Sequence, residues 1–134
     1  MIAFDTNVLV YCYDRSDPQR QEIALELIAS TRNGLLLWQV ACEFIAASRK
    51  LSVHGFTAEH AWKRLNELTA VLPLAEPTPV VLMTAKDLHL KGRWSFWDAM
   101  IVAGCLDRGV TRLYSEDLPG NHAPDGLEIV NPFA

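Results

Sequence analysis

The chain of 134 residues carries 12 Lys and Arg against 16 Asp and Glu, a net charge of −4, so no overall positive charge attracts nucleic acid or a membrane surface. Half of its residues are hydrophobic, which suits a single domain over residues 1–134. Its three cysteines form no CxxC pair, which argues against a disulfide framework or a zinc site, and we expect them to be small buried residues. No apolar run approaches the roughly 18 residues of a membrane span, and we expect a cytoplasmic protein.

The chain opens on an apolar run, residues 2–4, that ends abruptly in the polar residues Asp5, Thr6 and Asn7. So short a run predicts a strand covered on both faces rather than a core helix. Ligands of parallel sheets bind beyond the carboxyl ends of the strands, where Asp5 would lie. Thr6 or Asn7 could cap a short helix from Val8, and Asp5 could itself be only a turn or cap residue.

Helical periodicity and short apolar runs then alternate along the chain. Helices are predicted over residues 19–31, 38–50, 57–70, 79–91 and 96–108, and further strands at residues 35–38, 71–74, 111–114 and 127–130. The helix over residues 96–108 is apolar nearly all round, so we expect it to be the most buried. This alternation predicts a parallel sheet with helices on both faces.

Four acidic residues occupy positions that suggest a functional role beyond that of a solvent-exposed charge. Asp5 and Asp117 follow two predicted strands. Asp98 lies in the first turn of the predicted buried helix, and Glu43 lies on the apolar side of its own helix. Each acid also has a structural explanation: Asp98 could form a capping box with Ser95, Glu43 could pair with a buried arginine, and Asp117 could stabilise a turn.

One explanation covers all four acids together. Carboxylates that lie within a few ångströms repel one another, and they stay ionised at neutral pH only around a cation. Mg²⁺ or Mn²⁺ bound by few carboxylates and by water is the usual form in phosphate chemistry. The four acids therefore indicate a divalent metal site and metal-assisted phosphoryl transfer.

Four segments carry a resemblance to a known family: Asp5-Thr6-Asn7-Val8-Leu9, the lone Glu43 in a mid-chain helix, Ser95 to Ala103 around Trp-Asp-Ala, and Leu113 to Leu118 around Ser-Glu-Asp. In this order they resemble the PIN-domain nucleases, specifically the VapC toxins of bacterial toxin–antitoxin pairs. The resemblance spans the chain. It implies a three-layer α/β/α sandwich with a central mainly parallel sheet, and Mg²⁺- or Mn²⁺-dependent cleavage of RNA by in-line hydrolysis. It also implies a homodimer and a small antitoxin protein as partner.

The resemblance assigns catalytic roles to Asp5, Glu43, Asp98 and Asp117, with Asp5, Asp98 and Asp117 as metal ligands. Family members vary at the fourth acid, and Glu116 is adjacent to it in the sequence. The end of the predicted strand at Tyr114 favours Asp117.

Other side chains are expected to support the acids or to bind RNA. Thr6, Asn7 and Ser115 would orient carboxylates or water. An acidic protein that cuts RNA needs local cations, and Lys91 and Arg93 are the expected phosphate contacts, with Arg49 and Lys50 as further candidates. Trp94 and Trp97 could stack on bases, although we expect Trp97 in the core.

Two alternatives remain at this point. The segment Phe4-Asp5-Thr6-Asn7-Val8 approximates the opening motif of the haloacid-dehalogenase-like aspartyl-phosphate phosphatases. That chemistry needs an acid two residues beyond the nucleophile, and Asn7 cannot donate a proton as an acid does. The second alternative is a non-catalytic PIN-like binding module without metal, which the four retained acids disfavour.

Overall fold

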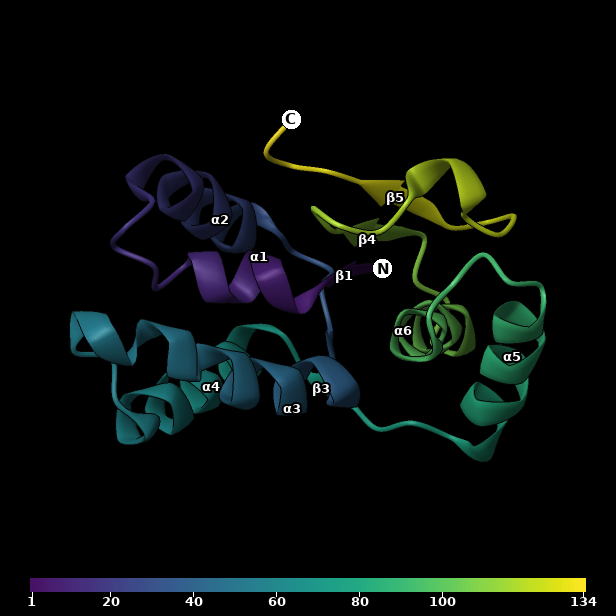
Figure 1. The fold of residues 1–134 in the computed structure, drawn as a ribbon, viewed down its shortest axis with the longest axis horizontal. Helices are drawn as coiled ribbons and strands as arrows, with labels where there is room; N and C mark the ends of the chain where they lie inside the picture. The colour runs from purple at the N-terminus through teal and green to yellow at the C-terminus, as the bar shows by residue number, and fades with distance from the viewer.

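A parallel sheet between two layers of helices forms the centre of the computed structural model, which describes all of residues 1–134 (Figure 1). Three strands pair in the order β1-β4-β5: β1 (Ile2–Phe4), β4 (Arg112–Tyr114) and β5 (Glu128–Val130). A second parallel pair consists of β2 (Leu36–Leu37) and β3 (Leu74–Ala75). A parallel bridge between Ile2 and Gly34 connects this pair to the free edge of β1.

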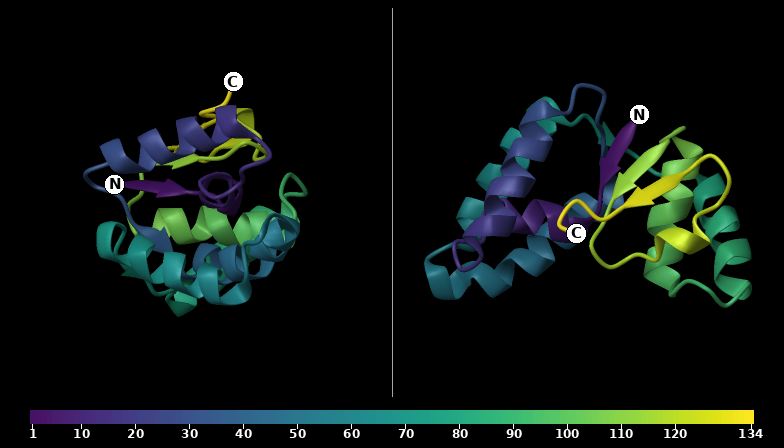
Figure 2. Two further views of the ribbon diagram at one scale, coloured as in Figure 1. Left: turned by 90° about the vertical axis from the view of Figure 1, so that its left-hand side faces the viewer. Right: turned by 90° about the horizontal axis from the view of Figure 1, so that it is seen from above.

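The helices cover both faces of the sheet. They are α1 (Thr6–Tyr11), α2 (Pro18–Ser30), α3 (Trp38–Ala47), α4 (Ala58–Val71), α5 (Pro79–Leu90) and α6 (Phe96–Asp107), with two 3-10 helices, η1 (Ser48–His54) and η2 (Gly120–His122). Helices α5 and α6 lie on one side of the strands and α1 to α4 on the other (Figures 1 and 2). The predicted α/β/α sandwich with a parallel sheet is therefore confirmed.

Most helices begin where the sequence predicts, but α1 begins earlier and for a different reason. Its N-cap is Asp5, whose Oδ1 accepts a hydrogen bond from the Thr6 N–H at 2.7 Å. The expectation that Thr6 or Asn7 caps a helix from Val8 is wrong, because both residues lie inside the first turn. The cap places the Asp5 carboxylate directly at the end of β1.

One further prediction differs in detail, and the cap of α5 has an unusual partner. Helix α4 continues to Val71, so the strand expected at residues 71–74 contributes only Leu74 to β3. Pro73 lacks an N–H, and its carbonyl accepts from the Leu36 N–H at 2.9 Å just before β3 begins. Thr78 occupies the N-cap position of α5, but its hydroxyl donates to Asp107 Oδ2 at 3.0 Å instead of capping the helix.

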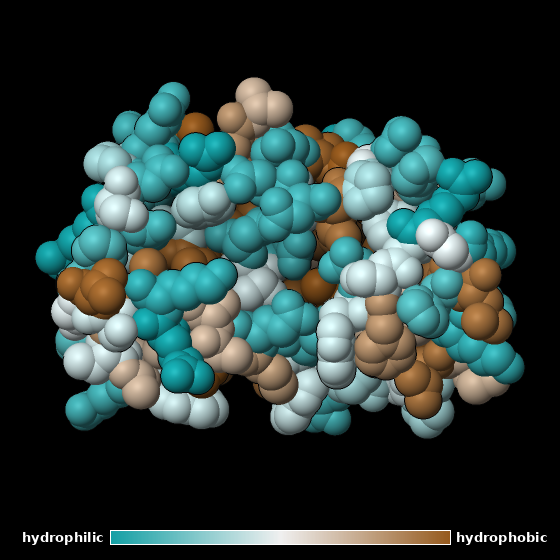
Figure 3. All heavy atoms as spheres, in the orientation of Figure 1, coloured by the Kyte–Doolittle hydropathy of each residue, from teal (hydrophilic) through white to brown (hydrophobic).

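A single hydrophobic core of 28 buried residues fills the space between the layers. Trp94 belongs to it, with 6% of its surface exposed, whereas Trp97 is 63% exposed, so the prediction of Trp97 in the core is wrong. Cys12 and Cys105 are buried as expected, but Cys42 is exposed. Hydrophilic side chains cover much of the outer face in Figure 3, with hydrophobic ones near α5. None of the helices has the length and apolar character needed to cross a membrane.

Leu113→Ala should lower the free energy of unfolding by about 2–5 kcal/mol, because it leaves a cavity in a packed core. Leu113 is fully buried on β4, the strand between β1 and β5. Leu90→Ala is the matched control: Leu90 is 72% exposed, and its truncation should change the free energy by no more than about 0.5 kcal/mol. Urea denaturation measures both values, and equal losses would contradict the central position of β4.

Candidate active site

A cleft of about 460 Å³ contains all four of the acids singled out in the sequence: Asp5, Glu43, Asp98 and Asp117. Asp5 directly follows β1, and Asp117 lies just beyond the end of β4. Glu43 comes from α3, and Asp98 from the first turn of α6. The fold therefore brings four acids from distant parts of the chain to one cleft at the carboxyl ends of two neighbouring parallel strands.

Asp5 is the most buried of these acids, with 7% of its surface exposed. Burial raises the pKa of Asp5, the hydrogen bonds from Ser115 and the Thr6 N–H act in the opposite direction, and the nearby charges of Glu43 and Asp98 raise it further. A carboxylate in this position is costly to ionise without a cation, because burial and like charges both oppose its charged form.

Three polar side chains each form a hydrogen bond with one of the acids: Thr6 Oγ1 with Glu43 Oε2 at 3.0 Å, Asn7 Nδ2 with Asp117 Oδ2 at 3.1 Å, and Ser115 Oγ with Asp5 Oδ2 at 2.7 Å. Ser115 Oγ also accepts from the N–H groups of Asp117 and Leu118, at 3.2 and 3.1 Å. The serine therefore connects the turn after β4 to the acid after β1, and the three contacts fix the orientation of three carboxylates.

Gln39 is a contact of Glu43 that the sequence reasoning missed. Its amide Nε2 donates to Glu43 Oε1 and, at 3.0 Å, to the carbonyl oxygen of Trp97. One side chain thereby links α3 to the first turn of α6, next to Asp98. Its Oε1 is buried without a hydrogen-bond partner. The spacing of four residues between Gln39 and Glu43 on one helix is the feature that could have indicated this pair.

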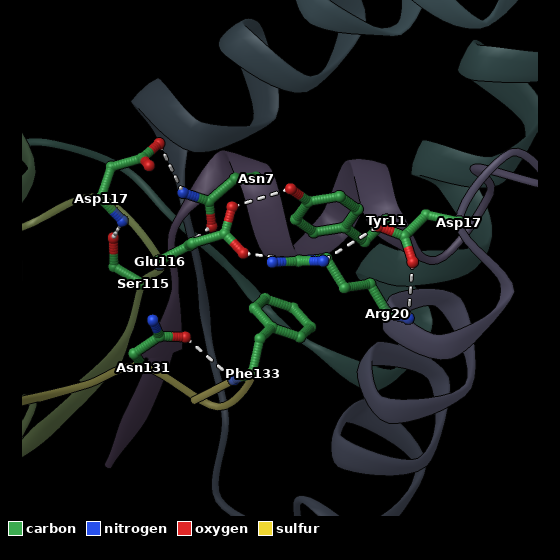
Figure 4. A network of polar contacts seen from close by, with 9 residues as sticks. All are labelled: Asn7, Tyr11, Asp17, Arg20, Ser115, Glu116, Asp117, Asn131 and Phe133. Atoms are coloured by element: carbon green, nitrogen blue, oxygen red, sulfur yellow. Dashed lines mark hydrogen bonds and ion pairs between the residues drawn. The ribbon is translucent and has the colours of Figure 1, made fainter.

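Glu116, the neighbour of Asp117, binds other side chains, although Asn7 contacts both residues: it donates to Asp117 Oδ2 and accepts from the Glu116 N–H (Figure 4). Its Oε1 accepts from the Tyr11 hydroxyl at 2.8 Å and its Oε2 from Arg20 Nε at 2.7 Å. Burial alone would raise the pKa of Glu116, but the bonds from Arg20 and Tyr11 outweigh burial and lower the pKa. Both of its carboxylate oxygens are thus engaged, and Figure 4 shows the Asp117 side chain pointing in another direction.

The donors in the cleft suit a hard divalent ion that keeps several waters. No three of these acids lie together as a ready-made ion cage, and the set of three ligands Asp5, Asp98 and Asp117 stays a prediction. Mg²⁺ usually keeps several waters beside one or two carboxylates. Asp98 is available for this, because only its N–H is engaged, donating to Ser95 Oγ at 3.3 Å, and its carboxylate forms no hydrogen bond. The capping box considered from the sequence is therefore only half formed.

The two cations expected to contact phosphate lie elsewhere. Neither Lys91 nor Arg93 lines the cleft, and Arg93 Nη1 lies 3.0 Å from His122 Nδ1. Lys50 is the one Lys or Arg that does line it. Trp94 is too buried to stack on a base, whereas the exposed Trp97 remains accessible.

Comparison with known proteins agrees with the fold. The family model of the PIN domain matches residues 2–118, and the chain belongs to the PIN domain family. This assignment replaces the phosphatase alternative. A search of curated proteins gives no match.

Several solved structures share the fold. A toxin–antitoxin complex from Klebsiella pneumoniae superimposes with a TM-score of 0.71 at 16% identity, over 98% of both chains. VapC20 of Mycobacterium tuberculosis, a toxin that cleaves the sarcin-ricin loop, superimposes with a TM-score of 0.69 at 19% identity. The match covers 87% of this chain and 90% of that one. VapBC2 from Rickettsia felis, bound to a DNA fragment of its promoter, superimposes with a TM-score of 0.69 at 18% identity, over 98% of both chains. At these identities the likeness shows the fold alone.

Glu116→Gln should lower the free energy of unfolding at neutral pH and should have little effect near pH 3. The bonds from Arg20 and Tyr11 lower the folded-state pKa of Glu116 below its unfolded value of about 4.3. Their stabilisation is therefore present above that unfolded value and is lost as the pH falls through the folded-state pKa.

Urea denaturation across this pH range measures the difference, with Glu26→Gln as the control because Glu26 is exposed and in no ion pair. A difference between wild type and Glu116→Gln that stays constant with pH would contradict the role of the ion pair.

Proposed function

We propose that this PIN domain is a metal-dependent endoribonuclease of the VapC type, which hydrolyses phosphodiester bonds of RNA. The observation that carries the proposal is the buried carboxylate of Asp5 in a cleft shared with Glu43, Asp98 and Asp117. Such a group of acids favours a bound divalent cation. The solved structure of a sarcin-ricin loop-cleaving toxin with the same fold supports RNA as the substrate.

An antitoxin protein and a second copy of the chain are the proposed partners. Toxin–antitoxin complexes among the structures with this fold support the antitoxin. The homodimer is proposed from the resemblance to the VapC toxins alone.

The proposed reaction adds water across one phosphodiester. The water oxygen bonds to phosphorus, the bond from phosphorus to the 3′ oxygen breaks, and a proton passes to the leaving oxygen, which gives a 5′-phosphate and a 3′-hydroxyl. Mg²⁺ or Mn²⁺ bound here would activate the water and neutralise charge on the leaving oxygen.

The protein's contribution is to fix its carboxylates before the substrate arrives. Asp5 cannot rotate freely, because the Thr6 N–H and Ser115 Oγ each bind one of its oxygens. Glu43 is fixed in the same way by Thr6 Oγ1 and Gln39 Nε2. Fixed carboxylates supply a charge distribution that needs no reorganisation during the reaction, and they can orient the attacking water.

The purified chain, free of any antitoxin, should cleave single-stranded or loop RNA with Mg²⁺ or Mn²⁺, and chelator should stop the cleavage. Asp5→Asn and Asp98→Asn should each lower the rate by at least about 100-fold without unfolding the chain. A gel assay with labelled RNA measures the rate, and circular dichroism checks the fold.

Activity that survives chelator unchanged would show that the metal mechanism is wrong. Loss of folded structure in both variants would instead favour a structural role for the acids.

Asp117→Asn and Glu116→Gln form a matched pair that separates the two neighbouring acids. Asp117→Asn should abolish most of the cleavage at unchanged stability, since Asp117 is exposed and its one side-chain contact, with Asn7, can be kept by an amide. Glu116→Gln should keep the cleavage and lose stability, because its carboxylate binds Arg20 and Tyr11. The same gel assay measures the cleavage and urea denaturation measures the stability. If Glu116→Gln loses cleavage and Asp117→Asn keeps it, Glu116 is the fourth acid of the site.

A further inference from the structure

Three hollows of the surface join end to end. Lys50 lines both the cleft of the acids and a second hollow of about 540 Å³. Phe56 lines both that second hollow and a third, of about 350 Å³. The three hollows are therefore neighbours on the surface, and we call the second and third hollows the basic track.

The basic track is lined by positively charged and histidine side chains and by no acid: Arg15, Arg49, Lys50, His54, His60 and Arg64. This contrasts with the net charge of −4 of the whole chain. Arg64 is paired with Glu67 at 2.9 Å, but Arg15 and Arg49 are in no ion pair within the chain. Two guanidinium groups in the track are therefore free to bind an anion.

The third hollow also offers an aromatic surface and a neutral donor. Tyr13 and Phe56 both line it, with their rings stacked at a centroid distance of 5.5 Å and an interplanar angle of 26°. His60 Nδ1 accepts a hydrogen bond from the Thr57 N–H at 3.1 Å, so the other ring nitrogen, Nε2, is the one that carries a proton. Aromatic rings beside basic groups are typical of surfaces that bind single-stranded nucleic acid.

The direction of the helices places this track at a definite distance from the acids. Helix α1 begins beside Asp5, and α3 with η1 leads from Glu43 to His54; both run from the centre of Figure 1 towards its left side. From Glu43 to His54 the path is about 20 Å long, from the rises of about 1.5 and 2.0 Å per residue in α- and 3-10 helices. A stacked strand has one phosphate about every 3.4 Å, so the track would reach on the order of six nucleotides from the cleaved bond.

We propose that the basic track binds the phosphate backbone of the RNA strand on one side of the cleaved bond. Arg49 and Arg15 contact successive parts of the backbone, and a base stacks against Tyr13 and Phe56. The identity of the ligand rests on the proposed function. An acidic peptide would also suit the arginines, but the continuity with the cleft and the aromatic rings favour a nucleic-acid strand.

The test compares two double variants of equal charge in chelator, where binding is measured without cleavage. Arg15→Gln with Arg49→Gln removes two cations from the track. Arg32→Gln with Lys86→Gln removes two exposed cations that line none of the three hollows. Fluorescence anisotropy with a labelled single-stranded RNA of about ten nucleotides gives the affinity as a function of salt, and circular dichroism checks the fold.

The slope of log K against log salt should fall by about 1.4 in the track variant, since each lost phosphate contact on a single strand contributes about 0.7. Its affinity should be on the order of 25-fold weaker than that of the control at about 0.1 M salt, and the difference should disappear towards 1 M.

Equal affinities and salt slopes for the two double variants would overturn the proposal. So would a track variant that binds RNA as the control does but loses binding of a glutamate peptide, because the track would then take an acidic protein segment. Cleavage is tested separately: a chain that cuts RNA with an unused track refutes only this inference. A chain that binds RNA through the track but never cuts it refutes only the proposed function.

Discussion

The parallel pairing of β1 with β4 is the interaction on which the candidate site depends. The pairing extends one residue beyond β1, where the Asp5 N–H donates to the Tyr114 carbonyl at 2.8 Å. Asp5 and Ser115 are the first residues after β1 and β4, and there Ser115 Oγ donates a hydrogen bond to Asp5 Oδ2 at 2.7 Å. A register shift of one residue would turn the side chains at the strand ends to the opposite face and separate this pair. The geometry of the candidate site is therefore a consequence of strand register.

Asp5 is a helix cap and a candidate metal ligand at once, and each of its oxygens accepts one hydrogen bond from the protein. Oδ1 caps α1, while Oδ2 is bound by Ser115. An ordinary N-cap is exposed and stabilises its helix by about 1 kcal/mol. At Asp5, burial and the charges of Glu43 and Asp98 oppose ionisation. The folded chain therefore disfavours the charged form of this carboxylate when no cation is bound. Strain of this kind is expected where function requires it.

The sequence predicted the fold and the meeting of the four acids because both follow from short-range patterns. Apolar runs that stop at polar residues locate strand ends, and parallel strands bring those ends to one edge of the sheet. Trp97 was misplaced because the apolar composition of α6 does not reveal that its first turn reaches beyond the core. The link from Gln39 to the Trp97 carbonyl depends on how α3 and α6 pack, which periodicity does not report. Lys91 and Arg93 are close to Asp98 in sequence, but they lie between α5 and α6 and do not line the cleft.

A net charge is a poor guide to what a surface can bind when opposite charges are well separated. The acids and the far end of the basic track are about 20 Å apart along α3 and η1, more than twice the Debye length of about 8 Å at physiological salt. The acids therefore do little to weaken the binding of an anion at Arg15, at the far end of the track. Arg49 lies only about 10 Å from Glu43 along α3 and η1, so screening separates it from the acids less completely. Lys50, which lines both regions, is where the two fields overlap. A net charge of −4 is therefore compatible both with the proposed divalent cation among the acids and with the proposed polyanion along the basic track.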